Sequence, residues 1–373
     1  MSVKINRRIF LNQCLKTTAG ALSAPWVKPV AASLAGSAFL SGCSTVDEYL
    51  LEENFYLKDQ TVIIGGGLAG LYTAYQLRKN KIDFRLFEGS RRFGGRVRSD
   101  QNLDFGASIF LKKHILLNQI IKDFSIETQN LTPDISYMAA GTETLVRQLA
   151  DRISGLMPYR NIRLQWKLVE IQKINRFYEI TFETPRGRRS YLARQVILAI
   201  PPSQWAGILG LKDLPEMQQA YSWLQSLKKE NIVKCSFHIP ASNNRLSHVK
   251  NFVQLSADGL YARQVLKHRK NASWAEVDFK FDQVGPVPAI EELQNWLRKN
   301  TTLMGYSNSF GTENFFDWQD VSLVQGAFFK NALPWAPSNS ATFQVIGDYA
   351  TNHEANSLEG ALSSATQALR YLI

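Results

Sequence analysis

The sequence Thr61-Val-Ile-Ile-Gly-Gly-Gly-Leu-Ala-Gly70, continued by the apolar run Leu71–Lys79, sets the architecture of this chain. Its apolar start predicts a short strand, its glycines a tight turn, and its continuation a helix. Gly65 permits the turn, Gly67 lets the backbone approach a pyrophosphate, and Gly70 lets the helix pack closely on its strand. The helix would then present free N–H groups to phosphates, as a dinucleotide site requires.

A second predicted strand, Asp83–Phe87, ends at an acidic residue, Glu88. The carboxylate stands where it could accept both hydroxyls of an adenosine ribose. This favours NAD or FAD over NADP, because the carboxylate would repel the 2′-phosphate. A glycine-rich turn alone could be an ordinary tight loop. Here strand, glycines, helix, second strand and acid follow one another within one βαβ-sized unit, so the sequence predicts dinucleotide binding.

The segment Arg92-Phe-Gly-Gly-Arg-Val97 narrows the choice of cofactor. Together with Glu88 it resembles the E-x-x-x-R-x-G-G-R signature of FAD-dependent amine oxidases, the family of flavin monoamine oxidases and polyamine oxidases. The resemblance implies that FAD is the cofactor and that this segment lies along it. The first group of expected FAD contacts consists of Gly65, Gly67, Leu68, Ala69, Gly70, Glu88, Arg92, Gly94, Gly95 and Arg96.

Three further segments extend the resemblance along the chain. Leu103–Ser108 is similar to a family segment that passes close to the flavin ring, and the strand Trp166–Ile174 to one that touches the adenine. Ala341–Asp348 and the helix after it resemble the closing FAD segment, with helix N–H groups at the flavin N1–C2 edge. From the residues alone, Gly106 could equally be a turn glycine and Leu168 a core strand residue. The second group of expected FAD contacts consists of Gly106, Ala107, Ser108, Leu168, Gly347, Asp348, Glu359, Gly360 and Ala361.

A lysine inside an apolar run is the first candidate for catalysis. Lys234 lies in the predicted strand Ile232–Ile239, and the resemblance implies that it reaches the flavin N5 through a water and assists reoxidation of the flavin. Burial there would make it a usable proton relay, because desolvation lowers the pKa of a lysine. The alternation of the strand also allows a position on the solvent face.

The segment Trp318–Phe329 is the second candidate and resembles the substrate side of the family's active site. The resemblance implies that Trp318 lies near the flavin and that Phe328 forms one wall of an aromatic cage that orients an amine. The opposite wall falls by spacing on Ser357, so the cage would be half missing. Ala327 replaces the cysteine that some relatives attach to the flavin, which implies that FAD is bound without a covalent link.

The predicted fold class is α/β, with a discontinuous Rossmann-like FAD-binding domain of the glutathione-reductase type. Its pieces are residues 61–110, 137–202 and 319–373, and an α/β substrate domain of antiparallel strands and helices takes residues 111–136 and 203–318. Family members usually insert a long helical cap after the flavin segment, but residues 111–136 have room for only one helix and a short link. The substrate pocket would therefore be open, or closed by a protein partner.

The N-terminus is predicted to be a targeting segment. Asn6-Arg-Arg-Ile-Phe-Leu11 resembles a twin-arginine export motif, and Leu40-Ser-Gly-Cys43 resembles a lipobox. Residues 1–43 would then be an export signal, residues 44–60 a tether, and the mature protein would be lipid-anchored to the bacterial membrane at Cys43, on the periplasmic side. An uncleaved membrane anchor is the alternative.

The composition argues against several function classes. The 373 residues carry a formal charge of +11, but residues 1–43 hold five bases and no acids, which leaves 38 basic against 32 acidic side chains. No run of Lys and Arg with interleaved aromatics predicts nucleic acid binding. The five histidines lack metal-ligand spacing, and the three cysteines leave no pair for a disulfide once the signal is removed and Cys43 is acylated.

The predicted function is that of an exported FAD-dependent oxidoreductase that oxidises the C–N bond of a small-molecule amine. Hydride would pass to FAD, and O₂ or another electron acceptor would reoxidise it. Two alternatives stay open. One is a desaturase or porphyrinogen-type oxidase, which shares the N-terminal FAD motifs, and the other is a non-catalytic FAD protein of the cell envelope that acts with a partner.

Overall fold

A computed structural model describes most of the chain from the first predicted strand onward. The described residues are 61–100, 103–154, 161–224, 229–239, 252–257, 260–268, 273–282, 290–304, 313–317, 328–329, 340–351 and 353–372. They all belong to one compact unit. The expected export signal and tether lie outside the described residues. Among the helices described, none is both long and apolar enough to cross a membrane.

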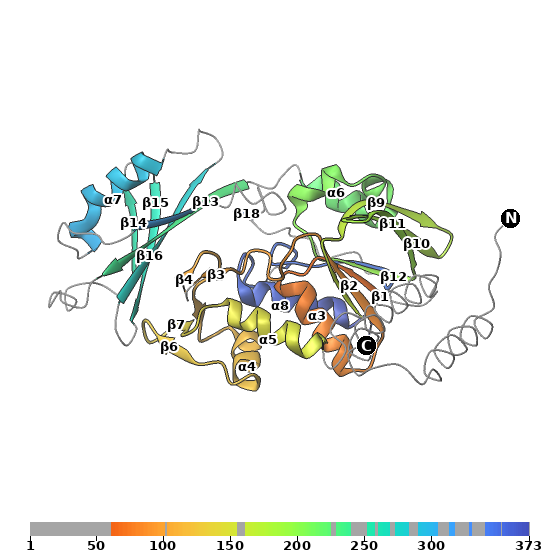
Figure 1. Ribbon diagram of the computed structural model, residues 1–373, viewed down its shortest axis with the longest axis horizontal. Coiled ribbons are helices and arrows are strands. Elements are labelled where there is room, and N and C mark those ends of the chain that lie inside the picture. The colour runs from red at the N-terminus through yellow and green to blue at the C-terminus, as the bar shows by residue number, and fades with distance from the viewer. Residues whose placement is uncertain are drawn as a thin grey trace, which may run out of the picture. The chain divides into compact units, whose positions relative to one another are not determined.

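A five-stranded parallel sheet forms the centre of the FAD-binding half (Figure 1). Distant segments of the sequence supply its strands, since β1 pairs with β2 on one side and with β12 on the other. β1 is buried along its whole length, as expected for a parallel sheet that is covered on both faces. In order across the sheet, the strands are β19 (Phe343–Val345), β12 (Gln195–Leu198), β1 (Thr61–Ile64), β2 (Phe84–Glu88) and β8 (Ile162–Leu164). The predicted discontinuous α/β fold is confirmed.

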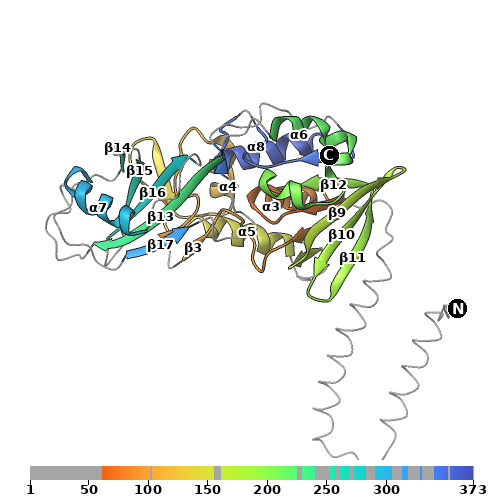
Figure 2. The ribbon, with the colours of Figure 1, turned by 90° about the horizontal axis from the view of Figure 1, so that it is seen from above.

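Helices pack against this sheet and against one another (Figure 2). The first helix, α3, packs against both α5 and α8, and α4 packs against α8. Their bounds are α3 (Leu68–Lys79), α4 (Ile115–Asp123), α5 (Glu143–Ser154) and α8 (Leu358–Leu369). Apolar side chains of all four helices join those of β1 and β2 in one buried core, which explains why the helical segments carry apolar residues at helical spacing.

An antiparallel meander separates β8 from β12 in the sequence. Its strands are β9 (Lys167–Ile174), β10 (Phe177–Thr184) and β11 (Gly187–Ala193). The sequence Pro185-Arg-Gly187 predicts a hairpin turn between β10 and β11, and the structure confirms it, because Thr184 pairs with Gly187, whose φ of +97° suits glycine. Aromatic rings join the meander to the parallel sheet, since Phe87 of β2 stacks on Phe182 of β10 with ring centroids 4.4 Å apart.

The connection after β12 is less helical than the sequence indicates. Helices were expected at Ser203–Leu209 and Glu216–Leu227. The structure instead has three short 3₁₀ turns and one α-helix of two turns. These elements are Pro202–Gly207, Leu211–Asp213, Pro215–Met217 and α6 (Gln218–Leu224).

A six-stranded antiparallel sheet forms the other half (Figure 1). Its strand order is β14–β15–β16–β13–β17, and β18 also pairs with β13. The strands are β13 (Lys229–Ile239), β14 (Phe252–Ala257), β15 (Leu260–His268), β16 (Ser273–Asp282), β17 (Glu313–Asp317) and β18 (Phe328–Phe329). One helix of this half, α7 (Ile290–Met304), buries Leu293 and Trp296.

The region after the flavin segment forms α4 and a small sheet in place of a long helical cap. In this sheet β7 (Ile135–Met138) pairs with β5 (Phe110–Leu111) and β6 (Thr128–Asn130). α4 packs on α8 of the FAD-binding half, while Leu131, between β6 and β7, lies in one buried apolar cluster with Val265 of the large sheet. Residues 111–136, which the sequence analysis assigned to the substrate domain, therefore contact both halves.

Candidate active site

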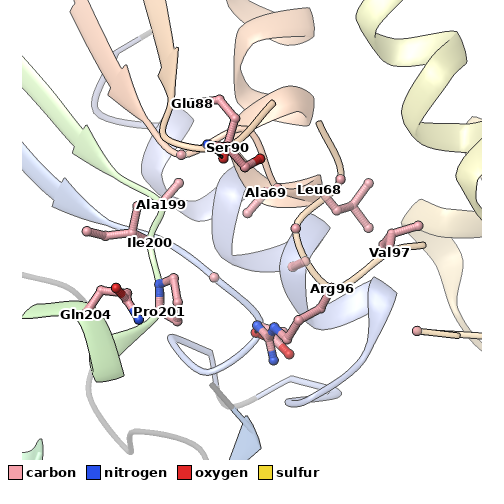
Figure 3. A pocket seen from close by; sticks show the side chains of 18 of the residues that line it. Leu68, Ala69, Glu88, Ser90, Arg96, Val97, Ala199, Ile200, Pro201 and Gln204 are labelled. Carbon is pink, nitrogen blue, oxygen red and sulfur yellow. Dashed lines mark hydrogen bonds and ion pairs between the residues drawn. The ribbon is translucent and has the colours of Figure 1, made fainter. Parts of the chain in front are cut away.

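A cavity of about 370 Å³ extends from the carboxyl ends of β1, β2 and β12 to the six-stranded sheet (Figure 3). Ligands of doubly wound sheets bind at the carboxyl ends of the strands, so this is the expected place for a dinucleotide. Figure 3 shows Glu88 and Ser90 at one end of the lining, Ala199, Ile200, Pro201 and Gln204 along one side, and Arg96 further along.

Most of the expected FAD contacts line this cavity. They are Gly65, Gly67, Leu68, Ala69, Glu88, Arg92, Gly94, Gly95, Arg96, Gly106, Ala107, Leu168, Gly347, Asp348 and Ala361. The others, Gly70, Ser108, Glu359 and Gly360, are not among its lining residues. Three consecutive residues that the sequence analysis did not assign to the site also line the cavity, and they are Ala199, Ile200 and Pro201. Their position directly after β12 was the available signal, because β12 is a parallel neighbour of β1.

Two glycine-rich loops form the middle of the cavity. Gly94 donates its N–H to the carbonyl of Gly66 at 2.8 Å, which holds the second loop against the first. A Cβ built on Gly67 meets no atom within 4 Å, so the backbone there is open to a ligand. A Cβ on Gly70 would lie only 2.0 Å from the carbonyl oxygen of Gly65. Gly67 and Gly70 therefore have the separate roles that the sequence indicates.

The guanidinium of Arg92 holds the second loop in shape. It donates to the carbonyl oxygens of Phe93, Gly95 and Val97 at 2.9, 2.7 and 3.0 Å. Burial lowers the pKa of Arg92. Because this side chain is committed to backbone carbonyls, its contribution to the site is to fix the conformation of the loop.

Glu88 lies at the end of β2, where the ribose was expected. Its Oε2 accepts from the N–H of Gly66 at 2.6 Å, and its Oε1 accepts from the N–H of Ser90 at 2.7 Å. Each carboxylate oxygen has a second lone pair, so the side chain can still accept two hydroxyl donors from the cavity. Glu88 can thus order the loop and bind a ribose together.

The start of α8 forms another part of the lining. Ser357 accepts from the N–H of Gly360 at 3.0 Å and caps the helix, whose first residues face the cavity at Leu358 and Ala361. A helix N-terminus carries a partial positive charge, which favours negative charge in the ligand. Nearby, Asp348 forms an ion pair with Arg96, and both side chains line the cavity.

Glu359 has a different position from the one expected. It is 1% exposed, and its two oxygens accept from the N–H groups of Leu116 and Leu117 at 3.0 and 2.8 Å. These donors belong to the first turn of α4, so Glu359 caps that helix and does not face the cavity. Gly360 is small for a steric reason, since its Cβ would lie 2.4 Å from the carbonyl oxygen of Glu354.

The segment expected beside the flavin ring packs on the second glycine loop. A Cβ on Gly106 would lie 1.8 Å from the carbonyl oxygen of Arg96, so close approach of two backbones requires this glycine. Ala107 lines the cavity. Ser108 is 1% exposed, and its Oγ has no hydrogen-bond partner within the part of the chain that the structure describes.

Lys234 lies at the end of the cavity that reaches the large sheet. Only 2% of its side chain is exposed, so it occupies the buried face of β13 and not the solvent face. Its Nζ donates to the carbonyl oxygen of Gly106 at 3.0 Å and pairs with Asp278 Oδ1 at 3.0 Å and with Glu276 Oε2 at 3.6 Å. The sequence predicted only that Lys234 is buried, and the structure adds the carboxylates of Asp278 and Glu276 beside its Nζ.

Lys234 belongs to a buried charge cluster that the sequence analysis missed. Glu276 Oε1 pairs with Lys267 at 2.9 Å, and Lys267 also pairs with Asp104. On the cavity side, Arg263 donates from Nε to Asp278 Oδ2 at 2.9 Å. The charge cluster consists of Lys234, Arg263, Lys267, Asp104, Glu276 and Asp278. The available signal was the alternation of Glu276 and Asp278 with apolar residues in β16.

The charges in the cluster shift one another's pKa values. Burial alone would raise the pKa of Asp278, but Arg263 and Lys234 outweigh it and hold that pKa well below its usual range. Burial alone would lower the pKa of Lys267, but Glu276 and Asp104 raise it above its usual range. Burial raises the pKa of Glu276, because Lys267 and Lys234 offset it only in part.

The second expected catalytic segment is described only in part. The backbone of Phe328 pairs with Glu230 of β13, whereas the Phe328 side chain and Trp318 lie outside the described residues. Ser357, at the expected opposite wall of the cage, is the capping residue of α8 and lines the cavity. Within the residues described, no group of His, Cys, Asp and Glu could hold a metal ion.

The lining fits FAD from one end to the other. Glu88 would take the ribose, the open backbone at Gly67 and the first turn of α3 would take phosphate, and Arg96 and Asp348 would lie alongside. Gly106 and the start of α8 would face the flavin.

Two family models match this chain. The model described as NAD(P)-binding Rossmann-like domain matches residues 63–124, and the model described as flavin containing amine oxidoreductase matches residues 133–373. Among curated proteins, ferredoxin–NADP reductase 1 of Latilactobacillus sakei subsp. sakei (strain 23K) is 27% identical over 154 residues, which are 38% of this chain. That match spans 46% of the relative, so the chain matches about half the length of this curated protein.

Solved structures resemble the chain over most of its length. Cyclohexylamine oxidase from Brevibacterium oxydans IH-35A matches with a TM-score of 0.67 and 12% identity, covering 84% of this chain and 98% of its own. Putrescine oxidase bound to putrescine gives a TM-score of 0.67 at 12% identity, with 84% and 99% covered. A protein assigned as a protoporphyrinogen oxidase from Exiguobacterium sp. 255-15 gives 0.64 at 10% identity, with 84% and 98% covered. At these identities the likeness shows a shared fold.

Proposed function

Because this chain belongs to the flavin-containing amine oxidoreductase family, we propose that it oxidises the C–N bond of a small-molecule amine, with FAD as its cofactor. The observation that carries the proposal is the position of Lys234, which is buried at the cavity and bonded to the carbonyl of Gly106 in the segment expected beside the flavin. FAD, when bound, supplies the hydride acceptor. O₂ or another acceptor then takes the electrons.

The chain's own residues have separate tasks in this reaction. The Nζ of Lys234 would hold a water or move a proton at the flavin end of the cavity. The N-terminus of α8 would stabilise negative charge at the same end. Glu88 and the two glycine loops would hold the other end of the cofactor, away from the reacting atoms.

The test is an anaerobic titration of the FAD-loaded protein with primary, secondary and polyamines, followed by absorbance of the oxidised flavin. Bleaching by one class of amine would support the proposal and identify the substrate class. A protein that holds FAD but is bleached by none of them would count against an amine substrate. A protein that cannot be loaded with FAD would contradict the proposal as a whole.

A second candidate function is that of a desaturase or porphyrinogen-type oxidase. It is favoured by Ser357, because a capping serine stands where an aromatic cage wall was expected. The Lys234→Met variant separates the two. An amine oxidase should lose reoxidation of its flavin by O₂, whereas a desaturase should not depend on this lysine. In both cases we propose that a protein partner covers the cavity, a proposal supported by the short region 111–136, which has no long helical cap.

The proposal extends to location. The motifs at Arg7-Arg8 and Cys43 support export and lipid attachment, which would place the enzyme on the periplasmic side of a bacterial membrane. Twin-arginine export carries folded proteins, which suits a protein that loads its cofactor before export.

A further inference from the structure

Three neighbouring strands of the large sheet bring opposite charges together on one face. In the order β15–β16–β13, Asp278 of β16 lies directly opposite Arg263 on one side and Lys234 on the other. Residues opposed in this way lie on the same face with their side chains in contact. The register of the sheet therefore fixes which carboxylate faces the lysine.

Asp278 divides its two oxygens between the two cations. Oδ1 lies 3.0 Å from Lys234 Nζ, while Oδ2 accepts from Arg263 Nε at 2.9 Å. These three side chains line the cavity. Glu276, Lys267 and Asp104 form a second tier behind them, away from the cavity lining.

Two acceptors lie within hydrogen-bond distance of Lys234 Nζ in the part of the chain that the structure describes. An ammonium has three N–H donors. Among the described residues, Gly106 O and Asp278 Oδ1 take two of them at 3.0 Å, and Glu276 Oε2, at 3.6 Å, is beyond hydrogen-bond distance. Lys234, whose Nζ makes these two contacts, also lines the cavity.

The second tier holds the flavin-side segment against the same sheet. Glu276 Oε1 accepts from the N–H of Asp104 at 2.8 Å, and the Asp104 side chain accepts from Thr142 Oγ1 and Ser99 Oγ at 2.7 and 2.6 Å. Asp104 lies two residues before Gly106. The acceptor at Gly106 and the acceptor at Asp278 are therefore fixed relative to each other.

We propose that Asp278 is a positioning residue, which holds the ammonium of Lys234 at the cavity and away from Glu276. The inference rests on the proposed role of Lys234. Without the Asp278 carboxylate, the flexible side chain of Lys234 would move toward Glu276, which is 3.6 Å away and lies behind the cavity lining. The lysine would be present but misplaced.

The test compares four FAD-loaded proteins: wild type, Asp278→Asn, Lys234→Met and the double variant. The primary readout is the midpoint potential of the bound flavin, which needs neither an amine nor O₂. Loss of a carboxylate by itself makes the site more positive and should raise the potential. Lys234→Met removes a positive charge and should lower the potential. If Asp278 acts by placing Lys234, Asp278→Asn should also lower the potential when Lys234 is present. In the Lys234→Met background, Asp278→Asn should not lower it.

A second readout is reoxidation by O₂ after chemical reduction, in which two electrons and two protons give H₂O₂. Asp278→Asn should slow it by about ten-fold or more, since misplacing a group by ~1 Å can cost about 10²-fold. The double variant should be no slower than Lys234→Met. Glu292→Gln, which removes a carboxylate at an exposed side chain of α7 in the same half, is the matched control and should leave the rate unchanged.

The outcomes separate the two proposals. A normal Lys234→Met protein would overturn the role of the lysine and this inference with it. A defective Lys234→Met protein beside a normal Asp278→Asn protein, or losses that add in the double variant, would overturn this inference alone. If Asp278→Asn does not fold, the double variant Asp278→Asn/Arg263→Gln, which removes one negative and one positive charge, takes its place. It is compared with and without Lys234→Met, and the expected results are the same.

Discussion

Single residues of this site are constrained for different reasons, although several are glycines. Gly67 is open to the cavity, Gly70 touches the turn behind it, and Gly106 touches the backbone of Arg96. Gly67 also has an ordinary extended backbone, with φ of −71° and ψ of −179°, which any residue can adopt. The protein itself therefore has space for a side chain at Gly67 but not at Gly70, and a dinucleotide bound at the cavity would account for the glycine at position 67.

Gly67→Ala and Gly70→Ala should separate cofactor binding from stability. We expect Gly67→Ala to leave the free energy of unfolding of the FAD-free protein within about 0.5 kcal/mol of wild type and to weaken FAD binding about ten-fold or more. Gly70→Ala should lower the free energy of unfolding by about 1–3 kcal/mol, because its Cβ would lie 2.0 Å from Gly65 O. Urea unfolding and a flavin fluorescence titration measure the two quantities. Equal losses of stability in both variants would contradict this assignment.

Acid should act on the protein through Asp278. Its pKa is lowered in the folded state, so it contributes stability that is present above its unfolded pKa of about 3.9 and is lost as the pH falls through the lower folded value. The free energy of unfolding of wild type should therefore fall more steeply below about pH 4 than that of Asp278→Asn. Urea unfolding from pH 3 to 7 measures the slopes, and parallel slopes would contradict the prediction.

At the scale of elements, α8 connects the cavity to α4. Ser357 caps α8, and Glu359, two residues later, caps α4 with both carboxylate oxygens. One turn of helix therefore presents its N-terminus to the cavity and holds a second helix on its other side. This arrangement explains an acidic residue in the first turn of α8 that faces away from the ligand.

Glu359→Gln should affect folding more than cofactor binding. The amide keeps the size of the side chain but leaves one buried N–H of α4 without an acceptor, which costs about 1–3 kcal/mol. We expect FAD affinity to change only a few-fold. Glu127→Gln, at an exposed side chain, is the control and should have little effect. Unchanged stability with a large loss of FAD affinity would instead support a direct role for Glu359 in binding FAD.

At the scale of the whole molecule, two halves enclose one cavity. The parallel sheet and its loops supply the part that fits FAD, and the large sheet supplies Lys234, Arg263 and Asp278. The contacts between the halves include buried polar ones, since Asp104 and Gly106 of the first half bond to Glu276, Lys267 and Lys234 of the second. Burying charges is favourable only when they are paired, so this interface depends on the complete charge cluster.

Location is a property of the whole chain and can be tested by fractionation. Replacing Arg7 and Arg8 together by Lys should keep the protein in the cytoplasm, because the export motif would be lost. Cys43→Ala should remove labelling by radioactive palmitate and release the protein from the membrane. Membrane attachment that survives Cys43→Ala would support the uncleaved anchor.

The sequence by itself determined the FAD-binding half. Its evidence is local, because the strand, glycine turn, helix and terminal acid lie within one short segment from Thr61 to Glu88. In this segment a steric reason explains the glycines, and an electrostatic reason explains the acid. Local sequence also predicted the hairpin at Gly187. It likewise showed that Ser357 stands where the family pattern has an aromatic residue.

Only the tertiary structure decided the charge cluster and the position of Glu359. Alternation along β13 left the face of Lys234 open, because a period of two does not say which face is buried. The partners of Lys234 come from strands whose order and register are long-range properties, with Asp278 opposite it and Glu276 beside it. Glu359 meets α4 across 242 residues of sequence at Leu117, a separation at which no local pattern can specify a contact.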